Sequence, residues 1–121
     1  MAKHADYSCN AGCDVELTLQ IIGGKWKGVI ITLLLVRPYR FNELQKVMPG
    51  VTQRILSKQL RDLEEAGIIE RVVVSEKPIA VQYSLTELGR TLSPIIRELK
   101  AWGLTYRAHA PLSLLEIESA A

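Results

Sequence analysis

Apolar residues in the first third of the chain recur every three or four positions, which is the spacing of one face of an α-helix. The stripe comprises Val15, Leu19, Ile22, Trp26, Ile30, Leu33 and Leu34. Gly23-Gly24 interrupts it, and glycine is a poor helix former. The pattern therefore predicts two core helices over residues 13–36, preceded by a flexible arm over residues 1–12.

A short helix ended by a tight turn is predicted next. Asn42 and Gln45 have the spacing of a capping box, in which Asn42 accepts from the backbone and Gln45 reaches back. This helix is expected to run to about Val47, where Pro49-Gly50 ends it.

A longer helix follows the turn. Thr52 is its expected N-cap, and Gly67 closes it after Ala66 because glycine readily adopts a positive φ. Two helices joined by such a turn, over residues 40–67, have the outline of a helix-turn-helix.

Residues 71–85 have the alternation of a β-hairpin. The segment 71–74 is β-branched, while Val81, Tyr83 and Leu85 alternate with polar residues, the pattern of a half-buried strand. The tip over residues 75–80 contains a proline and is expected to project from the body as a wing.

A last helix is predicted over residues 86–109, capped by Thr86. Its apolar positions step by four and three residues in a heptad-like seam: Leu88, Leu92, Ile95, Leu99, Trp102 and Tyr106. Pro94 is expected to kink this helix, and a tail over residues 110–121 follows. The predicted fold is mainly α with a small β-hairpin.

Length and composition favour one folded domain over residues 1–121. The chain has 121 residues, of which 48% are hydrophobic and 23% charged, enough apolar side chains for a core. The longest apolar stretch, residues 29–36, is too short to span a bilayer, and the N-terminus lacks the pattern of a secretory signal. We therefore expect a cytoplasmic protein with no membrane partner.

The charge is sorted along the chain, although its sum is only +2. Between Arg37 and Arg61 six basic residues stand against Glu43 alone, a net +5. Residues 62–70 follow with a net −4. The helix-turn-helix is therefore expected to have a basic side.

The basic residues gather on one face of the helix that begins after Thr52. On a helical wheel Leu56, Leu60 and Leu63 share one side. The residues of the opposite side are Arg54, Ser57, Lys58 and Arg61. An ordinary solvated helix face is the alternative interpretation.

This arrangement predicts that the helix enters a DNA major groove with its N-terminus first. The residues expected to reach base edges or phosphates are Gln53, Arg54, Ser57 and Lys58. Arg61 is expected on the DNA backbone, as are Thr52 and Arg40 at the two helix starts. Lys77 at the wing tip is expected to reach an adjacent minor groove.

The sequence resembles the HxlR-type winged helix-turn-helix regulators, bacterial relatives of the MarR family, over about residues 9–104. The matching blocks are residues 13–19 (CDVELTL), 22–27 (IGGKWK), 40–44 (RFNEL), 49–52 (PGVT), 56 and 59–64 (L and QLRDLE), 67–69 (GII), 81–86 (VQYSLT) and 102–103 (WG). Asp14 and Lys77 depart from the pattern, because the family often has a proline at each position.

The resemblance implies a homodimeric transcription factor, a repressor or autoregulator, that reads a pseudo-palindromic operator in double-stranded DNA. Its first and last helices would form the dimer interface. The apolar residues expected there are Val15, Leu19, Leu99, Trp102 and Tyr106. A wholly intramolecular core is the alternative.

Cys13 matches the cysteine through which some family members sense electrophiles or oxidants. A helix N-terminus favours its thiolate, whereas the neighbouring Asp14 and Glu16 oppose it. Cys9 could resolve a sulfenate at Cys13, or both thiols could be incidental. A zinc site of these two cysteines with His4 lacks a fourth ligand, so no metal is expected.

The chain lacks the constellations that enzymes need, since its two histidines lie near its ends and no phosphate-cradling glycine loop is present. We therefore expect neither an enzyme nor a cofactor. The more serious rival is a winged helix that binds a protein partner without contacting DNA directly.

Overall fold

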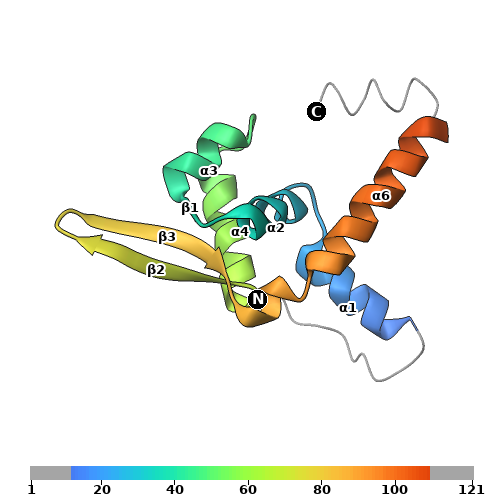
Figure 1. Cartoon of the computed structure of the whole chain (residues 1–121), viewed down its shortest axis with the longest axis horizontal. Helices are drawn as coiled ribbons and strands as arrows, with labels where there is room; N and C mark the ends of the chain where they lie inside the picture. Colours follow the sequence, from blue (N-terminus) through green and yellow to red (C-terminus); the bar gives the residue numbers. More distant parts are fainter. Residues whose placement is uncertain (1–11, 110–121) are drawn as a thin grey trace. The chain divides into compact units, whose positions relative to one another are not determined.

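The computed structural model describes residues 12–109, so the predicted arm and tail lie outside the described residues. The elements are α1 (Cys13–Ile22), α2 (Lys27–Val36), β1 (Tyr39–Arg40), α3 (Phe41–Val47), α4 (Gln53–Glu65), β2 (Ile69–Glu76), β3 (Ile79–Leu85), α5 (Glu87–Arg90) and α6 (Ser93–His109) (Figure 1). The backbone divides into two compact units, Met1–Thr91 and Leu92–Ala121. One domain over the whole chain stays a prediction.

The predicted hairpin is confirmed, and it belongs to a three-stranded antiparallel sheet. The strand order is β1-β3-β2, with Ile69 opposite Leu85 and Tyr39 opposite Tyr83. The strands pair as far as Glu76 and Ile79, so the predicted six-residue tip is wrong and the turn is Lys77-Pro78. Figure 1 shows the hairpin extending away from the helices of its unit.

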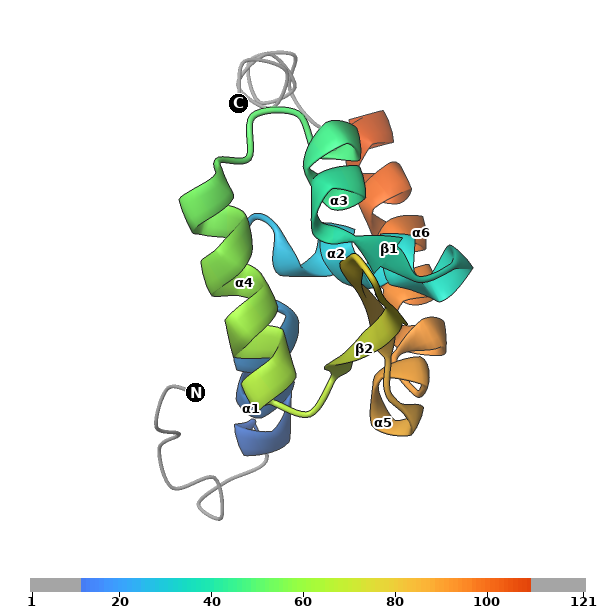
Figure 2. The ribbon, with the colours of Figure 1, turned by 90° about the vertical axis from the view of Figure 1, so that its left-hand side faces the viewer.

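The core of the first unit lies under α4. Leu56, Leu60 and Leu63 of α4 are buried, and α4 contacts both α2 and β2. The other elements contribute buried residues that are apolar: Ile30, Ile31, Leu34, Leu44, Ile69 and Leu85. Figure 2 shows α2 and α3 on the same side of α4, so that the opposite side of α4 faces outward.

The predicted ends of α4 and the break between the first two helices are confirmed. Thr52 Oγ1 accepts a 3.1 Å hydrogen bond from the Ile55 N–H, which satisfies an amide of the first turn. Gly67, with φ +78°, follows the C-cap Ala66. Gly23-Gly24 lies between α1 and α2.

The start of α3 differs from the prediction. Its N-cap is Arg40 instead of Asn42, and Glu43 instead of Gln45 reaches back, accepting a 2.8 Å hydrogen bond from the Arg40 N–H. Arg40 is held in an extended conformation because it pairs with Gln82 across β1 and β3. The helix therefore begins directly after this strand.

The single helix predicted over residues 86–109 is interrupted. Thr86 caps α5, accepting from the Gly89 N–H at 3.0 Å, and the C-cap of α5 is Thr91. Pro94 lies in the first turn of α6, where a missing N–H costs no intrahelical hydrogen bond. The expected kink at Pro94 is therefore wrong, because the proline helps to start a helix.

Within residues 12–109 no single helix has both the length and the apolar content to cross a membrane. In the same described part of the chain, α1 and α2 satisfy the two criteria when taken together, but they are bent by 74° at their break.

Candidate nucleic-acid interface

The outer face of α4 carries the basic residues predicted for it. Because its three leucines point into the core, the opposite side chains are turned to solvent. Arg54, Lys58 and Arg61 are exposed and Ser57 is half-buried. Together with Asp62 these four residues line one shallow depression on the helix surface. The structure thus brings together four of the predicted site residues.

The N-terminal end of α4 is accessible. Thr52 and Gln53 are both exposed. The Thr52 hydroxyl oxygen is engaged as the cap of the helix, so the O–H remains as its donor toward an outside acceptor. Gly50 with φ +87° makes the turn that delivers the chain to this point. Thr52 is therefore both a structural cap and a candidate phosphate donor.

Asp62 of α4 pairs with two lysines, one on its own helix and one on α2. Lys58 Nζ donates a 2.9 Å hydrogen bond to Asp62 Oδ2, and Lys27 Nζ lies 3.7 Å from the same oxygen. Burial of the carboxyl opposes its ionisation, but the Lys58 hydrogen bond and the Lys27 charge outweigh this, so the pKa of Asp62 lies below its ordinary value. Lys58 therefore already holds a charged partner on its own helix.

Arg40 is positioned by a small cluster at the start of α3. Glu43 accepts from the Arg40 N–H and lies 3.5 Å from Arg37 Nη1. The Arg37 guanidinium in turn lies 3.8 Å above the centre of the Tyr39 ring. The backbone hydrogen bond from Arg40 lowers the pKa of Glu43, and the Arg37 charge adds to this. The cluster leaves the Arg40 side chain exposed.

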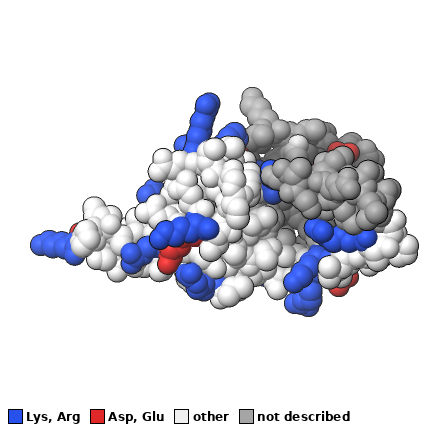
Figure 3. Space-filling model, turned by 90° about the horizontal axis from the view of Figure 1, so that it is seen from above, with Lys and Arg blue, Asp and Glu red and all other residues white. Residues whose placement is uncertain are grey.

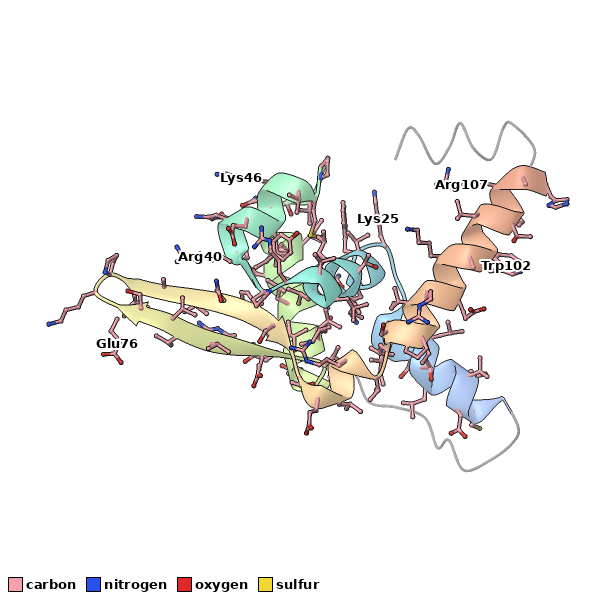
Figure 4. All side chains as sticks on the ribbon, in the orientation of Figure 1. Lys25, Arg40, Lys46, Glu76, Trp102 and Arg107 are labelled. Atoms are coloured by element: carbon pink, nitrogen blue, oxygen red, sulfur yellow. The ribbon has the colours of Figure 1, made fainter. Side chains whose placement is uncertain are left out.

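The wing carries Lys77 at its turn, exposed and far from α4 along the hairpin. Seen from above, basic side chains spread over the wing and the body beside it, with few acidic ones among them (Figure 3). Glu76, next to Lys77, lies on the lower side of the wing (Figure 4).

Two lysines that the sequence interpretation assigned no role lie on this upper side. Figure 4 shows Lys25 and Lys46 along the upper side of the first unit, where Arg40 also lies. Lys46 belongs to α3, and Lys25 precedes α2 with its Nζ 5.1 Å from the Trp26 ring centre. Lys46 was part of the +5 segment, so its charge was visible in the sequence. The direction in which the Lys46 side chain points depends on where α3 begins.

The residues predicted for the dimer interface are exposed in each unit. Val15 and Leu19 of α1 are 61% and 53% exposed. In α6 Leu99 and Tyr106 are exposed, and so is Trp102, whose ring stacks on that of Tyr106 with 5.4 Å between centroids. Among residues 92–109 the buried positions are Leu92 and Ile96 instead. Both helices therefore present apolar faces that the single chain leaves uncovered.

Cys13 is the first residue of α1 and is 2% exposed. Cys9 and His4 lie outside the described residues, so neither their pairing with Cys13 nor the three-ligand zinc arrangement is tested. Between Gly12 and His109 no group of three or more His, Cys, Asp or Glu side chains could hold a metal ion.

Comparison with known proteins matches residues 21–111 to the HxlR-like helix-turn-helix family. The HTH-type transcriptional regulator YdeP of Bacillus subtilis (strain 168) is 52% identical over 104 residues, covering 84% of this chain and 81% of YdeP. The reduced form of the redox regulator HypR has a TM-score of 0.74 and 49% identity, covering 78% of this chain and 93% of HypR. Reduced YodB, a transcriptional regulator from B. subtilis, has a TM-score of 0.72 and 34% identity, covering 81% and 96%. The winged sheet, the helix-turn-helix and these matches agree: the chain belongs to the HxlR-like helix-turn-helix family of transcriptional regulators.

Proposed function

We propose that this chain is a cytoplasmic, homodimeric regulator that binds a pseudo-palindromic operator in double-stranded DNA and controls transcription as a repressor or autoregulator. It acts by binding and not by catalysis. The outer face of α4 is the observation that carries the proposal. Arg54, Lys58 and Arg61 are exposed there, on a helix held to the core by its opposite side.

The contacts follow from the position of each residue. Gln53, Arg54 and Ser57 lie in the first turns of α4, the part of a recognition helix that reaches base edges. Lys58 and Arg61 follow on the same face, while Thr52 and Arg40 flank the helix starts as donors to phosphates. Lys77 at the wing turn would enter the neighbouring minor groove.

The proposed dimer rests on the two uncovered apolar faces. The face of α1 includes Val15 and Leu19, and that of α6 includes Leu99, Trp102 and Tyr106. Exposed apolar helix faces favour association, and two-fold symmetry would present two copies of α4 to two half-sites.

A footprint on the DNA upstream of the chain's own gene tests the proposal. Duplex fragments of that region would be titrated with the full chain at several salt concentrations. We expect protection of two half-sites and an affinity that falls steeply with salt, as phosphate contacts require. Absence of binding to any duplex would overturn the proposal and favour a winged helix that binds a protein partner.

We also propose that an electrophile or oxidant acts on this regulator through Cys13. Two observations support this: the thiol sits at the first position of a helix, and HypR, which this chain resembles, is a redox regulator. Its burial, however, requires that a reagent reach it through a local opening of α1. Cys9 is the candidate resolving thiol.

Diamide treatment tests the role of Cys13. We expect the oxidised wild type to change its DNA affinity, whereas Cys13→Ser should bind alike with and without diamide. Cys9→Ser separates a disulfide between the two residues from a modification of Cys13 alone. An equal loss of binding in wild type and Cys13→Ser would remove the sensing role.

A further inference from the structure

The three cations on the outer face of α4 are not equivalent. Lys58 is paired with Asp62, whereas Arg54 and Arg61 form no ion pair within residues 12–109. The arginines can therefore turn to a phosphate at once. Lys58 must first give up a charged hydrogen bond on its own helix.

Asp62 differs from its partner in accessibility. The Asp62 side chain is 26% exposed and that of Lys27, its second partner, 17%, while the Lys58 side chain is 66% exposed. If Lys58 leaves, Lys27 still lies 3.7 Å from Asp62 Oδ2 and keeps the carboxylate from being left without a cation. The structure thus allows Lys58 to turn toward an outside acceptor without stranding a partly buried charge.

We propose that Asp62 sets the DNA specificity of this helix: it holds the Lys58 ammonium away from the phosphates of any duplex, in a position where its remaining N–H groups can donate to a base edge. The inference rests on the proposed DNA-binding function. A phosphate offers Lys58 no more than Asp62 already does, since both are anionic oxygen acceptors. Asp62 occupies one N–H of the ammonium, and the others can donate to O6 and N7 of guanine in the major groove, but only where the sequence places guanine beneath Lys58.

The basic residues on the outer face of α4 would therefore make two different kinds of contact with DNA. Arg54 and Arg61 supply contacts that any sequence can satisfy, which governs non-specific affinity. Lys58 adds a contact that depends on sequence, because its release has a cost that a phosphate does not return. Removing Asp62 should therefore turn Lys58 into a third non-specific cation. The ratio of specific to non-specific affinity would fall.

Asp62→Asn tests this, with Glu64→Gln as the matched control. Both variants exchange one carboxylate of α4 for an amide, but Glu64 is exposed and forms no ion pair within residues 12–109. Binding would be measured by fluorescence anisotropy on two duplexes of equal length, the operator recovered by selection from random DNA and a scrambled version. The salt dependence of both would be recorded.

For Asp62→Asn we expect scrambled DNA to bind about three- to tenfold more tightly, with the salt slope steeper by about one phosphate contact. Operator affinity should change less than twofold. Glu64→Gln should change both by less than twofold. An equal gain in the two variants would mean that any lost carboxylate helps, which overturns the inference.

Lys58→Gln, alone and combined with Asp62→Asn, isolates the lysine. Alone it should weaken operator binding about tenfold and scrambled binding less than twofold. In the double variant it should abolish the gain on scrambled DNA. A gain that persists without Lys58 would show that Asp62 acts by repelling phosphate and would overturn the inference.

The single variant Lys58→Gln keeps the inference testable if Asp62→Asn unfolds, which thermal unfolding would reveal. Equal losses on operator and scrambled DNA would then overturn it. A wild-type chain that binds neither duplex would overturn the proposed function itself. If the wild type binds the operator specifically but the variants give one of the contrary results above, the proposed function stands and only the role of Asp62 is removed.

Discussion

Thr86 ties the end of the wing to the segment that precedes it, because its N–H donates a 3.0 Å hydrogen bond to the Ile68 carbonyl. Its hydroxyl donates to Gly67 O at 2.6 Å and accepts from the Gly89 N–H at 3.0 Å. One residue thus connects the C-terminal end of the helix-turn-helix to the first turn of α5. The two strands between these points are held together at their base.

Thr86→Ala should destabilise the chain by about 1–3 kcal/mol, because the change removes a helix cap and a hydrogen bond to the backbone. Thr86→Ser keeps the hydroxyl and should recover most of the loss. Denaturant unfolding of the three proteins measures the difference. A Thr86→Ala variant as stable as wild type would show that the hydroxyl contacts contribute nothing.

Gly89 makes a close approach that forbids a side chain. A Cβ at this position would overlap the Ile68 carbonyl oxygen, a backbone atom, and lie 3.0 Å from Leu85 Cδ2. Gly89→Ala should therefore cost at least about 2 kcal/mol of unfolding free energy.

Gly28→Ala is the matched control, since a Cβ there meets nothing within 4 Å. Alanine is the better helix former, so this variant should gain about 0.5–1 kcal/mol. The unfolding free energy should therefore fall in Gly89→Ala and rise in Gly28→Ala, which one series of denaturant titrations can measure. A change of the same sign in both variants would contradict the close packing at α5.

Charge reversal at Arg54 should weaken DNA binding much more than reversal elsewhere. Arg54→Glu places a carboxylate at the start of α4, so we expect a loss of at least about tenfold near 0.1 M salt and a salt slope smaller by about one. Arg90→Glu makes the same charge change at an exposed position of α5. Anisotropy titrations of both variants provide the comparison, and equal losses would count against α4 as the contact surface.

Glu43 predicts a pH dependence of stability. Its pKa is lowered on folding, mainly by the Arg40 backbone hydrogen bond, so the folded state favours the ionised form. Its contribution is fully present above the unfolded pKa of about 4.3 and is lost as the pH falls through the lower folded pKa. Wild type should thus be more stable than Glu43→Gln at pH 7.

Thermal unfolding of wild type and Glu43→Gln across acid pH measures this difference. It should shrink below the ordinary pKa of a glutamate and disappear once Glu43 is protonated in both states. A difference that stays constant down to the lowest pH would assign the effect to packing and not to charge.

Residues close in sequence were enough to predict where α4 begins and ends. Thr52 and Gly67 act on amides and carbonyls a few residues away, so their roles can be predicted from sequence alone. The start of α3 could not be predicted in the same way. It depends on the pairing of Arg40 with Gln82, which lies more than 40 positions further along the chain.

The same limit applies to the candidate site. The wheel predicted which residues of α4 face outward, because their spacing is periodic. The Lys27 contact with Asp62 joins two helices whose packing no local pattern encodes. The upper-side position of Lys25 and Lys46 likewise follows from the fold (Figure 4).

Self-association should depend on one face of α6. Leu99 and Leu104 are both exposed, at 49% and 60%, but lie on different sides of the helix. Only Leu99 shares the stripe of Trp102 and Tyr106. Because each leucine is exposed in the single chain, truncating it costs the monomer little, and any loss reports on the contact between copies.

We therefore expect Leu99→Ala to raise the dissociation constant of the dimer by about tenfold, and Leu104→Ala to leave it within about twofold. Sedimentation equilibrium on wild type and both variants measures the constants directly. A wild type that stays monomeric at high concentration would remove the proposed dimer. Equal effects of the two substitutions would instead show that the association does not use the Leu99 face of α6, since the two leucines differ in that respect.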